Sequence, residues 1–149
     1  MADTGITRLH GADLSDEVEF LAARARSIGT ARANAQLAPL ELRVRSYAVL
    51  ALACSGFDPS QRELAEYLSL DASQVVALVD DLEKRALVSR VPDARDRRSN
   101  AIIATDAGRT LHATARIAAR EAENASLAAL DPAERETLRS LLKRVAFQD

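Results

Sequence analysis

Apolar residues recur every three to four positions along most of the chain, which is the spacing of one face of an α-helix. The first twelve residues lack this pattern: they are polar, contain two glycines and are expected to be flexible. The periodic stretches predict helices over about residues 13–37, 42–54, 60–68, 71–85 and 105–130, and a last helix that begins at residue 131. The chain is therefore expected to be mainly helical.

Two short helices in the middle of the chain begin with N-terminal capping signals. Residues 60–63 read Ser-Gln-Arg-Glu, a capping box in which the Ser60 hydroxyl accepts from the Glu63 amide and the Glu63 carboxylate accepts from the Ser60 amide. Residues 71–74 read Asp-Ala-Ser-Gln, which is a second cap signature. Only residues 69–71 separate the two helices, so the pair is predicted to form a helix-turn-helix unit.

The hydrophobic period changes after Ala86. Residues 87–91 and 100–104 are short runs typical of β-strands, and the charged segment 92–99 lies between them. A hairpin that directly follows a helix-turn-helix unit is the wing of a winged helix. The fold class is therefore α+β: mainly α with a small β-hairpin wing.

The terminal helices are too long, and too apolar along one stripe, to be covered by a centre of about 75 residues. Their most economical partner is a second copy across a two-fold axis, so the pattern itself predicts a homodimer. The expected organisation is a flexible segment 1–12, a dimerisation helix in 13–41, a winged helix-turn-helix DNA-binding lobe in 42–104 and C-terminal dimerisation helices in 105–149.

Composition excludes several classes of function. The 149 residues suit one domain, and 30 alanines against 3% aromatic residues favour helix over an all-β fold. One cysteine and two histidines cannot build a zinc site or a disulfide framework, so neither metal nor cofactor is expected. No apolar run approaches about 18 residues and no secretion signal is recognisable, which predicts a cytoplasmic protein without a membrane span. No nucleophile, base and metal come together in the sequence, so an enzyme is not expected.

Charge is distributed unevenly along the chain. The net charge is −2, yet residues 85–98 hold five arginines against two aspartates, a net charge of +3 that leaves −5 for the remainder. A basic protrusion on an acidic body predicts localised contact with DNA. Arg95, Arg97 and Arg98 at the hairpin tip suit the minor groove, where narrow A·T-rich segments concentrate negative potential. Asp96 is expected to pair with a neighbouring arginine; the alternative for the whole segment is a solvated, salt-bridged turn.

The second helix of the pair is expected to enter the major groove with its N-terminal side chains on base edges. Ser73 and Gln74 lie there and can hydrogen-bond to bases, although residues of the first turn are also ordinary capping residues. Weaker contacts with the DNA backbone are assigned to Ser60, Gln61 and Arg90.

Three motifs resemble the MarR family of bacterial winged-helix transcriptional regulators. Residues 82–90 read Leu-Glu-Lys-Arg-Ala-Leu-Val-Ser-Arg, residues 93–98 read Asp-Ala-Arg-Asp-Arg-Arg and residues 105–108 read Thr-Asp-Ala-Gly. Residues 47–50 and 62–68 are similar to that family's second and third helices. The resemblance implies a homodimer that binds pseudo-palindromic double-stranded DNA and is released by a small anionic or phenolic effector or by cysteine oxidation. It also implies that Arg95, Arg97 and Arg98 in the wing and Ser73 and Gln74 in the recognition helix contact DNA.

The sequence departs from the family pattern at four positions. Ala77 and Asp81 stand where many members have arginine, which predicts weaker or unusual contact with the major groove. Ala86 replaces a common glycine after the recognition helix, so the left-handed cap is expected to be strained or absent. Ala104 replaces a common leucine, which is expected to loosen packing at the base of the wing.

The effector site is the least specified part of the sequence. The resemblance implies a pocket between the dimerisation helices and the DNA-binding lobe, which Arg43, Arg45 and Tyr47 could face; the alternative is solvated arginines and a core tyrosine. His112 could line it. Cys54 ends an apolar helix without a basic neighbour in sequence and is expected to be a small buried hydrophobe rather than a redox site.

These patterns together predict a dimeric, ligand-responsive transcriptional repressor of the MarR type. The alternative is a winged-helix module that binds an acidic protein partner through its hairpin and has no specific DNA site.

Overall fold

The structure is a computed structural model that describes residues 6–148. The chain divides into two compact units, one formed by residues up to 32 together with those from 123 on, and the other by residues 33–122. The long helices α1 (Val18–Leu37) and α5 (Asp106–Ser126) each contribute to both units. Each unit is described by itself.

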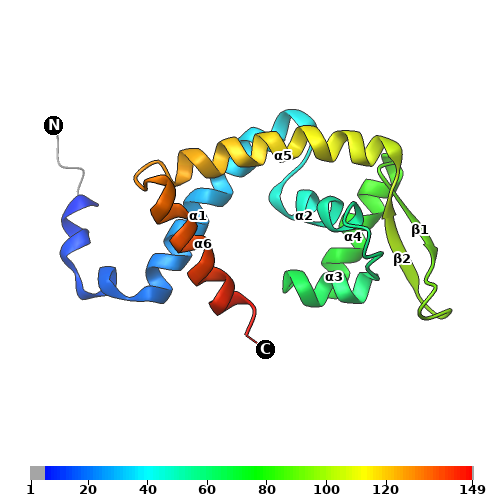
Figure 1. Cartoon of the computed structure of the whole chain (residues 1–149), viewed down its shortest axis with the longest axis horizontal. Helices are drawn as coiled ribbons and strands as arrows, with labels where there is room; N and C mark the ends of the chain where they lie inside the picture. Colours follow the sequence, from blue (N-terminus) through cyan, green and yellow to red (C-terminus); the bar gives the residue numbers. More distant parts are fainter. Residues whose placement is uncertain (1–5, 149) are drawn as a thin grey trace. The chain divides into compact units, whose positions relative to one another are not determined.

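The unit of residues 33–122 contains the predicted winged helix (Figure 1). After the end of α1 and the short 3-10 helix Ala38–Leu40, it runs through α2 (Val44–Ala53), α3 (Gln61–Leu68) and α4 (Ala72–Lys84). The strands β1 (Val88–Pro92) and β2 (Asn100–Ala104) follow, and then α5 begins. The tip of the hairpin extends away from α5 (Figure 1). This order and these bounds confirm the winged helix-turn-helix predicted from the sequence.

Local signals explain where these helices start and stop. Ser60 and Glu63 form the predicted capping box at the start of α3. Ser69 adopts the left-handed conformation, with φ of 52°, and turns the chain into α4. Asp71 occupies the N-cap of α4, as the sequence of residues 71–74 predicted, but its side chain does not make the expected capping hydrogen bond. Ala86 is left-handed at φ of 55°, which confirms the strained form of the cap, because a Cβ disfavours this region.

The two strands pair antiparallel, with Val88 opposite Ala104 and Pro92 opposite Asn100. The segment before α3 pairs briefly with β2. The amide of Ile102 donates to the carbonyl of Pro59 at 2.8 Å, and Ser60 forms an antiparallel β-bridge with Ala101. The wing is thereby attached to the helix-turn-helix pair by backbone hydrogen bonds.

All sixteen buried apolar residues in the described part of the chain belong to this unit. They are Leu37, Leu42, Val49, Leu50, Ala53, Leu64, Val75, Val79, Leu82, Leu87, Val88, Ala101, Ile102, Ala104, Ala115 and Ala122. Ala104 is among them, so the position predicted to be loosely packed is buried, with 3% of its surface exposed. The unit thus has a hydrophobic core of its own.

The other unit contains the N-terminal segment, the first part of α1, the end of α5 and α6 (Pro132–Ala146). The prediction that a helix begins at residue 13 is wrong: Asp13–Asp16 forms a 3-10 helix, a single irregular turn, and α1 begins at Val18. The fifth helix ends at Ser126 rather than near residue 130. Asp131, where the last helix was predicted to begin, caps α6 with its carboxylate on the Glu134 amide at 2.9 Å.

The N-terminal segment predicted to be flexible lies partly outside the described residues, since the structure begins at Ile6. Within the described part, Thr7–Gly11 forms a 3-10 helix. No helix in residues 6–148 is long and apolar enough to cross a membrane.

Candidate nucleic-acid interface

The wing tip holds two cations without a partner. Arg97 and Arg98 are exposed, and their side chains form no ion pair with any residue that the structure describes. The Asp96 carboxylate does not pair with a neighbouring guanidinium, as the sequence suggested; it accepts a hydrogen bond from the backbone amide of Arg98 at 2.9 Å. Asp96 therefore shapes the turn and leaves both guanidinium groups available to an external anion.

Arg95 is engaged within the protein instead. Its guanidinium donates to both oxygens of Asp93 at 3.1 and 3.2 Å, to both oxygens of Glu63 at 3.0 Å and to the carbonyl of Asp58 at 3.0 Å. The side chain of Asp93 is only 6% exposed, so this pair is held where β1 runs into the loop of the wing. Arg95 thus joins the wing to the first turn of α3 and to the loop before it.

These hydrogen bonds shift two carboxylates in the same direction. The Arg95 guanidinium lowers the pKa of Asp93. The pKa of Glu63 is lowered first by the hydrogen bond from the Ser60 amide and then by Arg95. Both carboxylates are therefore held in their charged form near neutral pH, which keeps the Arg95 network intact.

Arg90, assigned from the sequence to the DNA backbone, makes a second internal network. Its guanidinium donates to the side-chain oxygen of Gln61 at 2.8 Å and to the carboxylates of Asp80 and Glu83. Gln61 begins α3, whereas Asp80 and Glu83 belong to α4. Arg90 therefore ties β1 to both helices of the helix-turn-helix unit, and its donors already have partners.

The polar groups of Ser60 are similarly occupied. Its hydroxyl accepts from the Glu63 amide at 3.2 Å and donates to the Glu63 carboxylate at 2.9 Å, and its own amide donates to the same carboxylate at 2.7 Å. Ser60 is also buried at 9% exposure. Its place in the structure is that of a helix cap.

The recognition helix presents its first turn to solvent. Val75, Val79 and Leu82 of α4 are fully buried, whereas Ser73 and Gln74 are exposed. The two residues that the sequence assigned to base contacts thus lie on the accessible side of α4, at the end that enters a major groove in helix-turn-helix proteins.

The candidate effector residues occupy another part of the same unit. The half-buried Tyr47 ring stacks on His112 of α5, with ring centroids 5.8 Å apart and an interplanar angle of 27°. Burial, and secondarily the charge of Arg116, lowers the pKa of His112, so this ring is neutral at pH 7. Arg45 is exposed.

Cys54 is half-buried, in partial agreement with the sequence analysis. Burial raises the pKa of its thiol even though the charge of Arg109 acts in the opposite direction. A raised thiol pKa means little thiolate at neutral pH, which is the opposite of what a reactive cysteine requires.

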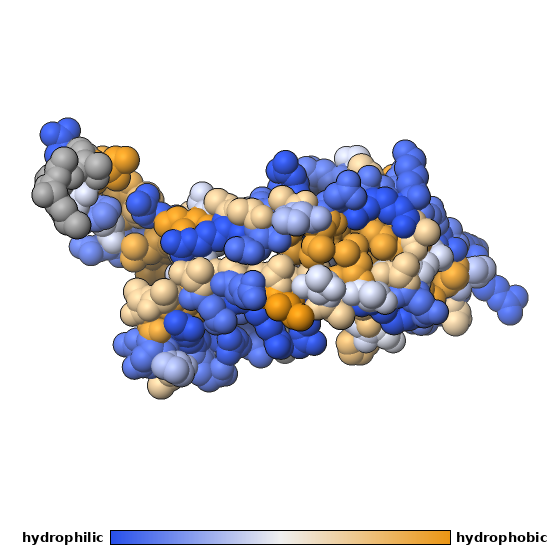
Figure 2. All heavy atoms as spheres, turned by 90° about the horizontal axis from the view of Figure 1, so that it is seen from above, coloured by the Kyte–Doolittle hydropathy of each residue, from blue (hydrophilic) through white to orange (hydrophobic). Residues whose placement is uncertain are grey.

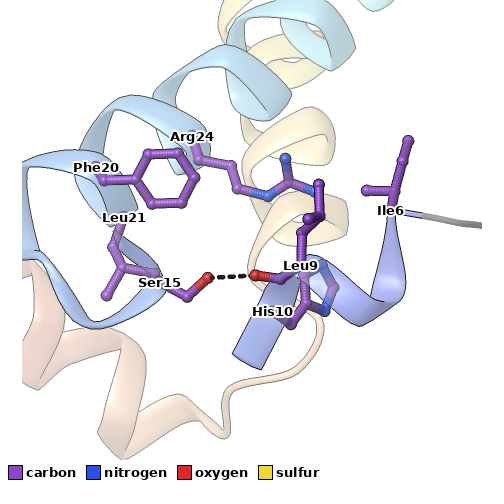
Figure 3. Close-up of a pocket in the computed structure, with 7 residues that line it drawn as sticks. All are labelled: Ile6, Leu9, His10, Ser15, Phe20, Leu21 and Arg24. Carbon is purple, nitrogen blue, oxygen red and sulfur yellow. Dashed lines mark hydrogen bonds between the residues drawn. The ribbon is translucent and has the colours of Figure 1, made fainter. Parts of the chain in front are cut away.

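A hollow in the N-terminal unit was not foreseen from the sequence. It has a volume of about 370 Å³ and lies between the N-terminal 3-10 turns and the start of α1 (Figure 3). Its lining residues are Ile6, Leu9, His10, Ser15, Phe20, Leu21 and Arg24. The walls are mainly apolar, and the Ser15 hydroxyl is occupied by a hydrogen bond to the carbonyl of Leu9 at 3.2 Å.

The helix pair, the hairpin attached to it and the unpaired arginines at the tip define a winged helix-turn-helix protein. The comparisons identify the family. A sequence model of the MarR family matches residues 42–99. A MarR-family transcriptional regulator from Rhodococcus sp. RHA1 is 37% identical, with a TM-score of 0.87 over 93% of this chain and 99% of that one. The chain belongs to the MarR family of transcriptional regulators, which are not enzymes.

Two further structures are similar. CouR from Rhodococcus jostii RHA1, bound to p-coumaroyl-CoA, is 36% identical, with a TM-score of 0.83 over 93% of this chain and 97% of that chain. A probable transcriptional regulator from Pseudomonas aeruginosa is 30% identical, with a TM-score of 0.73 over 89% and 98%. A search of curated proteins gave no match.

Sequence reasoning placed Arg95 at the tip with Arg97 and Arg98 but missed its carboxylate partners. The spacing of Asp93 and Arg95, two residues apart at the end of a strand, was a local signal that the pair could form. Glu63 lies 32 residues away in sequence and was already assigned to a capping box, so nothing local indicated its second role.

Proposed function

We propose that this protein is a homodimeric, DNA-binding transcriptional repressor whose release from DNA is controlled by a small anionic or phenolic effector. The observation that carries the proposal is the pair of exposed, unpaired arginines, Arg97 and Arg98, on the same lobe as an exposed recognition helix. A cation held at the tip of a protruding hairpin suits the minor groove, while α4 suits the adjacent major groove.

The division of the wing arginines refines the proposed contacts. Arg97 and Arg98 are assigned to DNA, and Arg95 is assigned to holding the wing against α3. Ser73 and Gln74 remain the proposed base contacts of α4. Arg90 and Ser60 are left out of the contact set, because their polar groups are satisfied within the protein.

The proposed dimer rests on the N-terminal and C-terminal unit. None of its described residues is a buried apolar residue, yet it exposes large apolar side chains, which include Ile6, Leu9, Leu14, Val18, Leu21, Ile28, Leu141, Leu142 and Val145. Hydrophobic side chains reach the surface around the N-terminal segment (Figure 2). A unit without its own core requires a partner surface, and a second copy supplies a self-complementary one. Such a dimer would present its two recognition helices about 34 Å apart, one turn of B-DNA.

The effector class is supported by one relative and one contact. CouR, which is 36% identical, was solved with p-coumaroyl-CoA, an anionic thioester of a phenolic acid. In this chain the stacked Tyr47 and His112 rings form an aromatic surface, and Arg45 is a nearby cation in sequence. Thermal shift with salicylate, p-coumarate and p-coumaroyl-CoA tests the class, with Tyr47→Phe as the variant and Tyr67→Phe as its matched control.

The DNA-binding proposal is tested with duplexes from the region upstream of the protein's own coding sequence. The variant Arg97→Ala/Arg98→Ala removes four cations from a dimer, and at about 0.9 per phosphate contact the slope of log K against log salt should fall by up to about 3.6. Arg116→Ala/Arg120→Ala removes the same number of exposed cations from α5, about 15 and 21 Å along the helix from Asp106 at 1.5 Å per residue, and is the control for net charge.

Equal binding by the double variant and the control would overturn the assignment of the wing. If the wild-type protein bound no duplex but captured an acidic protein through the same two arginines, the protein-interaction module would be the correct reading.

A further inference from the structure

The exposed side of the recognition helix is uncharged in its first two turns. Val75, Val79 and Leu82 lie on the buried side of α4. At 100° per residue, the opposite side carries Ser73 and Ala77, while Val76 and Gln74 lie on its two flanks. Ser73, Gln74, Val76 and Ala77 are all exposed, and the apolar residue Val76 is 38% exposed.

The acidic residues further along α4 are paired with the protein's own arginines. Asp80 and Glu83 accept from Arg90, and Asp81 lies 3.9 Å from the Arg85 guanidinium. Two guanidinium groups thereby offset part of the charge of these three carboxylates. The part of α4 left to meet a ligand is the uncharged surface from Ser73 to Ala77.

This surface lacks the side chains that read guanine. The commonest specific contact with a G·C pair is an arginine or lysine that donates to both guanine acceptors in the major groove. Residues 72–83 contain neither, and Lys84 at the end of α4 is eleven residues, or about 16 Å, beyond Ser73. A glutamine, by contrast, can bond both adenine groups, and small apolar side chains contact the methyl group of thymine.

We propose that α4 selects A·T pairs by contact of Val76 and Ala77 with thymine methyl groups, with Gln74 bonded to adenine. This inference rests on the proposed DNA-binding function and names the chemistry of its half-site. Specificity then comes from methyl groups and adenine edges, whereas the wing arginines supply affinity. A recognition helix without cations needs an independent source of affinity, and Arg97 and Arg98 at the wing tip are placed to provide it.

The test begins with selection of a random pool of 30-bp duplexes by the wild-type protein. The half-sites recovered should be rich in A·T at the positions that face α4. Each selected thymine is then replaced by deoxyuridine, which removes only the methyl group. Because burial of a methyl group against an apolar side chain stabilises the complex, the loss of one methyl group should weaken binding by about fourfold.

A coupling measurement identifies the residue that makes the contact. In Val76→Ser, the ratio of the affinities for the thymine and the deoxyuridine duplex should fall toward one at a single thymine. The reason is that the methyl group of this thymine has lost its apolar partner. Arg97→Ala should weaken binding to the thymine and deoxyuridine duplexes equally and leave the penalty unchanged. Because Val76 is already partly exposed, Val76→Ser is expected to fold, and Val76→Ala is the second variant for the same cycle.

The outcomes separate the two proposals. A selected site with guanine at the positions facing α4, or no deoxyuridine penalty at any thymine, overturns the methyl readout even if Arg97→Ala still weakens binding. No enrichment of any duplex, together with no effect of Arg97→Ala, overturns DNA binding itself.

Discussion

Gly108 lies in the first turn of α5, directly against the base of the wing, and its replacement by alanine is expected to be strongly destabilising. A Cβ at this position would lie 1.9 Å from the Leu87 carbonyl oxygen and 3.4 Å from the Leu50 side chain. Cβ atoms do not approach heavy atoms closer than about 3.0 Å, so the backbone would have to move by about 1.1 Å, the difference between the two distances. The obstacle is main chain, which cannot rotate away as a side chain can.

The magnitude follows from what that movement breaks. The Leu87 carbonyl accepts from the Thr105 amide at 3.0 Å, and the Thr105 hydroxyl accepts from the Gly108 amide at 3.0 Å. Overpacking of a tight site costs about 1–3 kcal/mol, and a strained hydrogen bond adds about 0.5–1.5 kcal/mol. The higher helix propensity of alanine returns about 0.5–1 kcal/mol. We therefore expect Gly108→Ala to lower the free energy of unfolding by about 2 kcal/mol, within a range of about 0.5–4 kcal/mol.

Urea denaturation followed by circular dichroism measures this change, and Gly29→Ala is the matched control. Gly29 is also a helical glycine, but its added Cβ would meet only the Ser126 hydroxyl, at 4.0 Å. Gly29→Ala should therefore raise stability by about 0.5–1 kcal/mol. If the two substitutions shifted the urea midpoint in the same direction, the close approach at Leu87 would not be the determinant.

Three further changes test local features of the winged helix. Ala86→Gly should relieve the left-handed strain at φ of 55° and raise stability by up to about 1 kcal/mol, measured as a higher urea midpoint; a lower midpoint would contradict the strain. Ser60→Ala should lower the free energy of unfolding by about 1 kcal/mol through loss of the α3 cap, whereas an unchanged urea midpoint would show that the cap contributes nothing. Arg95→Gln should destabilise most at neutral pH. The depressed pKa values of Glu63 and Asp93 make their contribution fully present above their unfolded values, that is above about pH 5, and lost as the pH falls through their folded values. The gap between wild type and variant in urea midpoint should therefore narrow between about pH 5 and pH 3; a gap constant with pH would refute the carboxylate pairing.

The sequence was sufficient to predict most of the winged helix, for reasons that are local. The Ser60 and Asp131 boxes and the Thr105 cap are satisfied within a few residues along the chain, so the residue pattern determines them. The change from a helical to an alternating period placed both strands within one residue of their observed bounds. The start of α1 was misplaced because Leu14, in the 3-10 turn of residues 13–16, is spaced from Val18 as in a helix, and no cap marks the boundary between them.

The candidate site was less predictable, because it depends on pairs distant in sequence. A count of charges gave the wing a net charge of +3, but three of its five arginines are occupied. Arg85 donates to the carbonyls of Leu40 and Glu41, and Arg90 and Arg95 bind carboxylates from α3 and α4. A net charge cannot distinguish a cation that binds its own fold from one that is available to a ligand. Only the contacts reduce the expected interface to the two arginines at the tip.

The distribution of buried residues also constrains how an effector could act. The unit of residues 33–122 holds all sixteen buried apolar residues of the described chain and carries its own core, whereas the terminal unit exposes its apolar side chains and is proposed to be completed by a second copy. The lobe should then behave as one body, braced by Arg90 and Arg95, and the distance between two lobes should depend on the weaker terminal unit. An effector needs only a differential binding free energy of about 1–3 kcal/mol between two spacings to change DNA affinity by about 5- to 150-fold. If an effector acts in this way, the wing and α4 need not change their internal structure. Hydrogen exchange should then show effector-dependent protection around Tyr47 and His112 and in the terminal unit, with the amides of the wing and α4 unchanged.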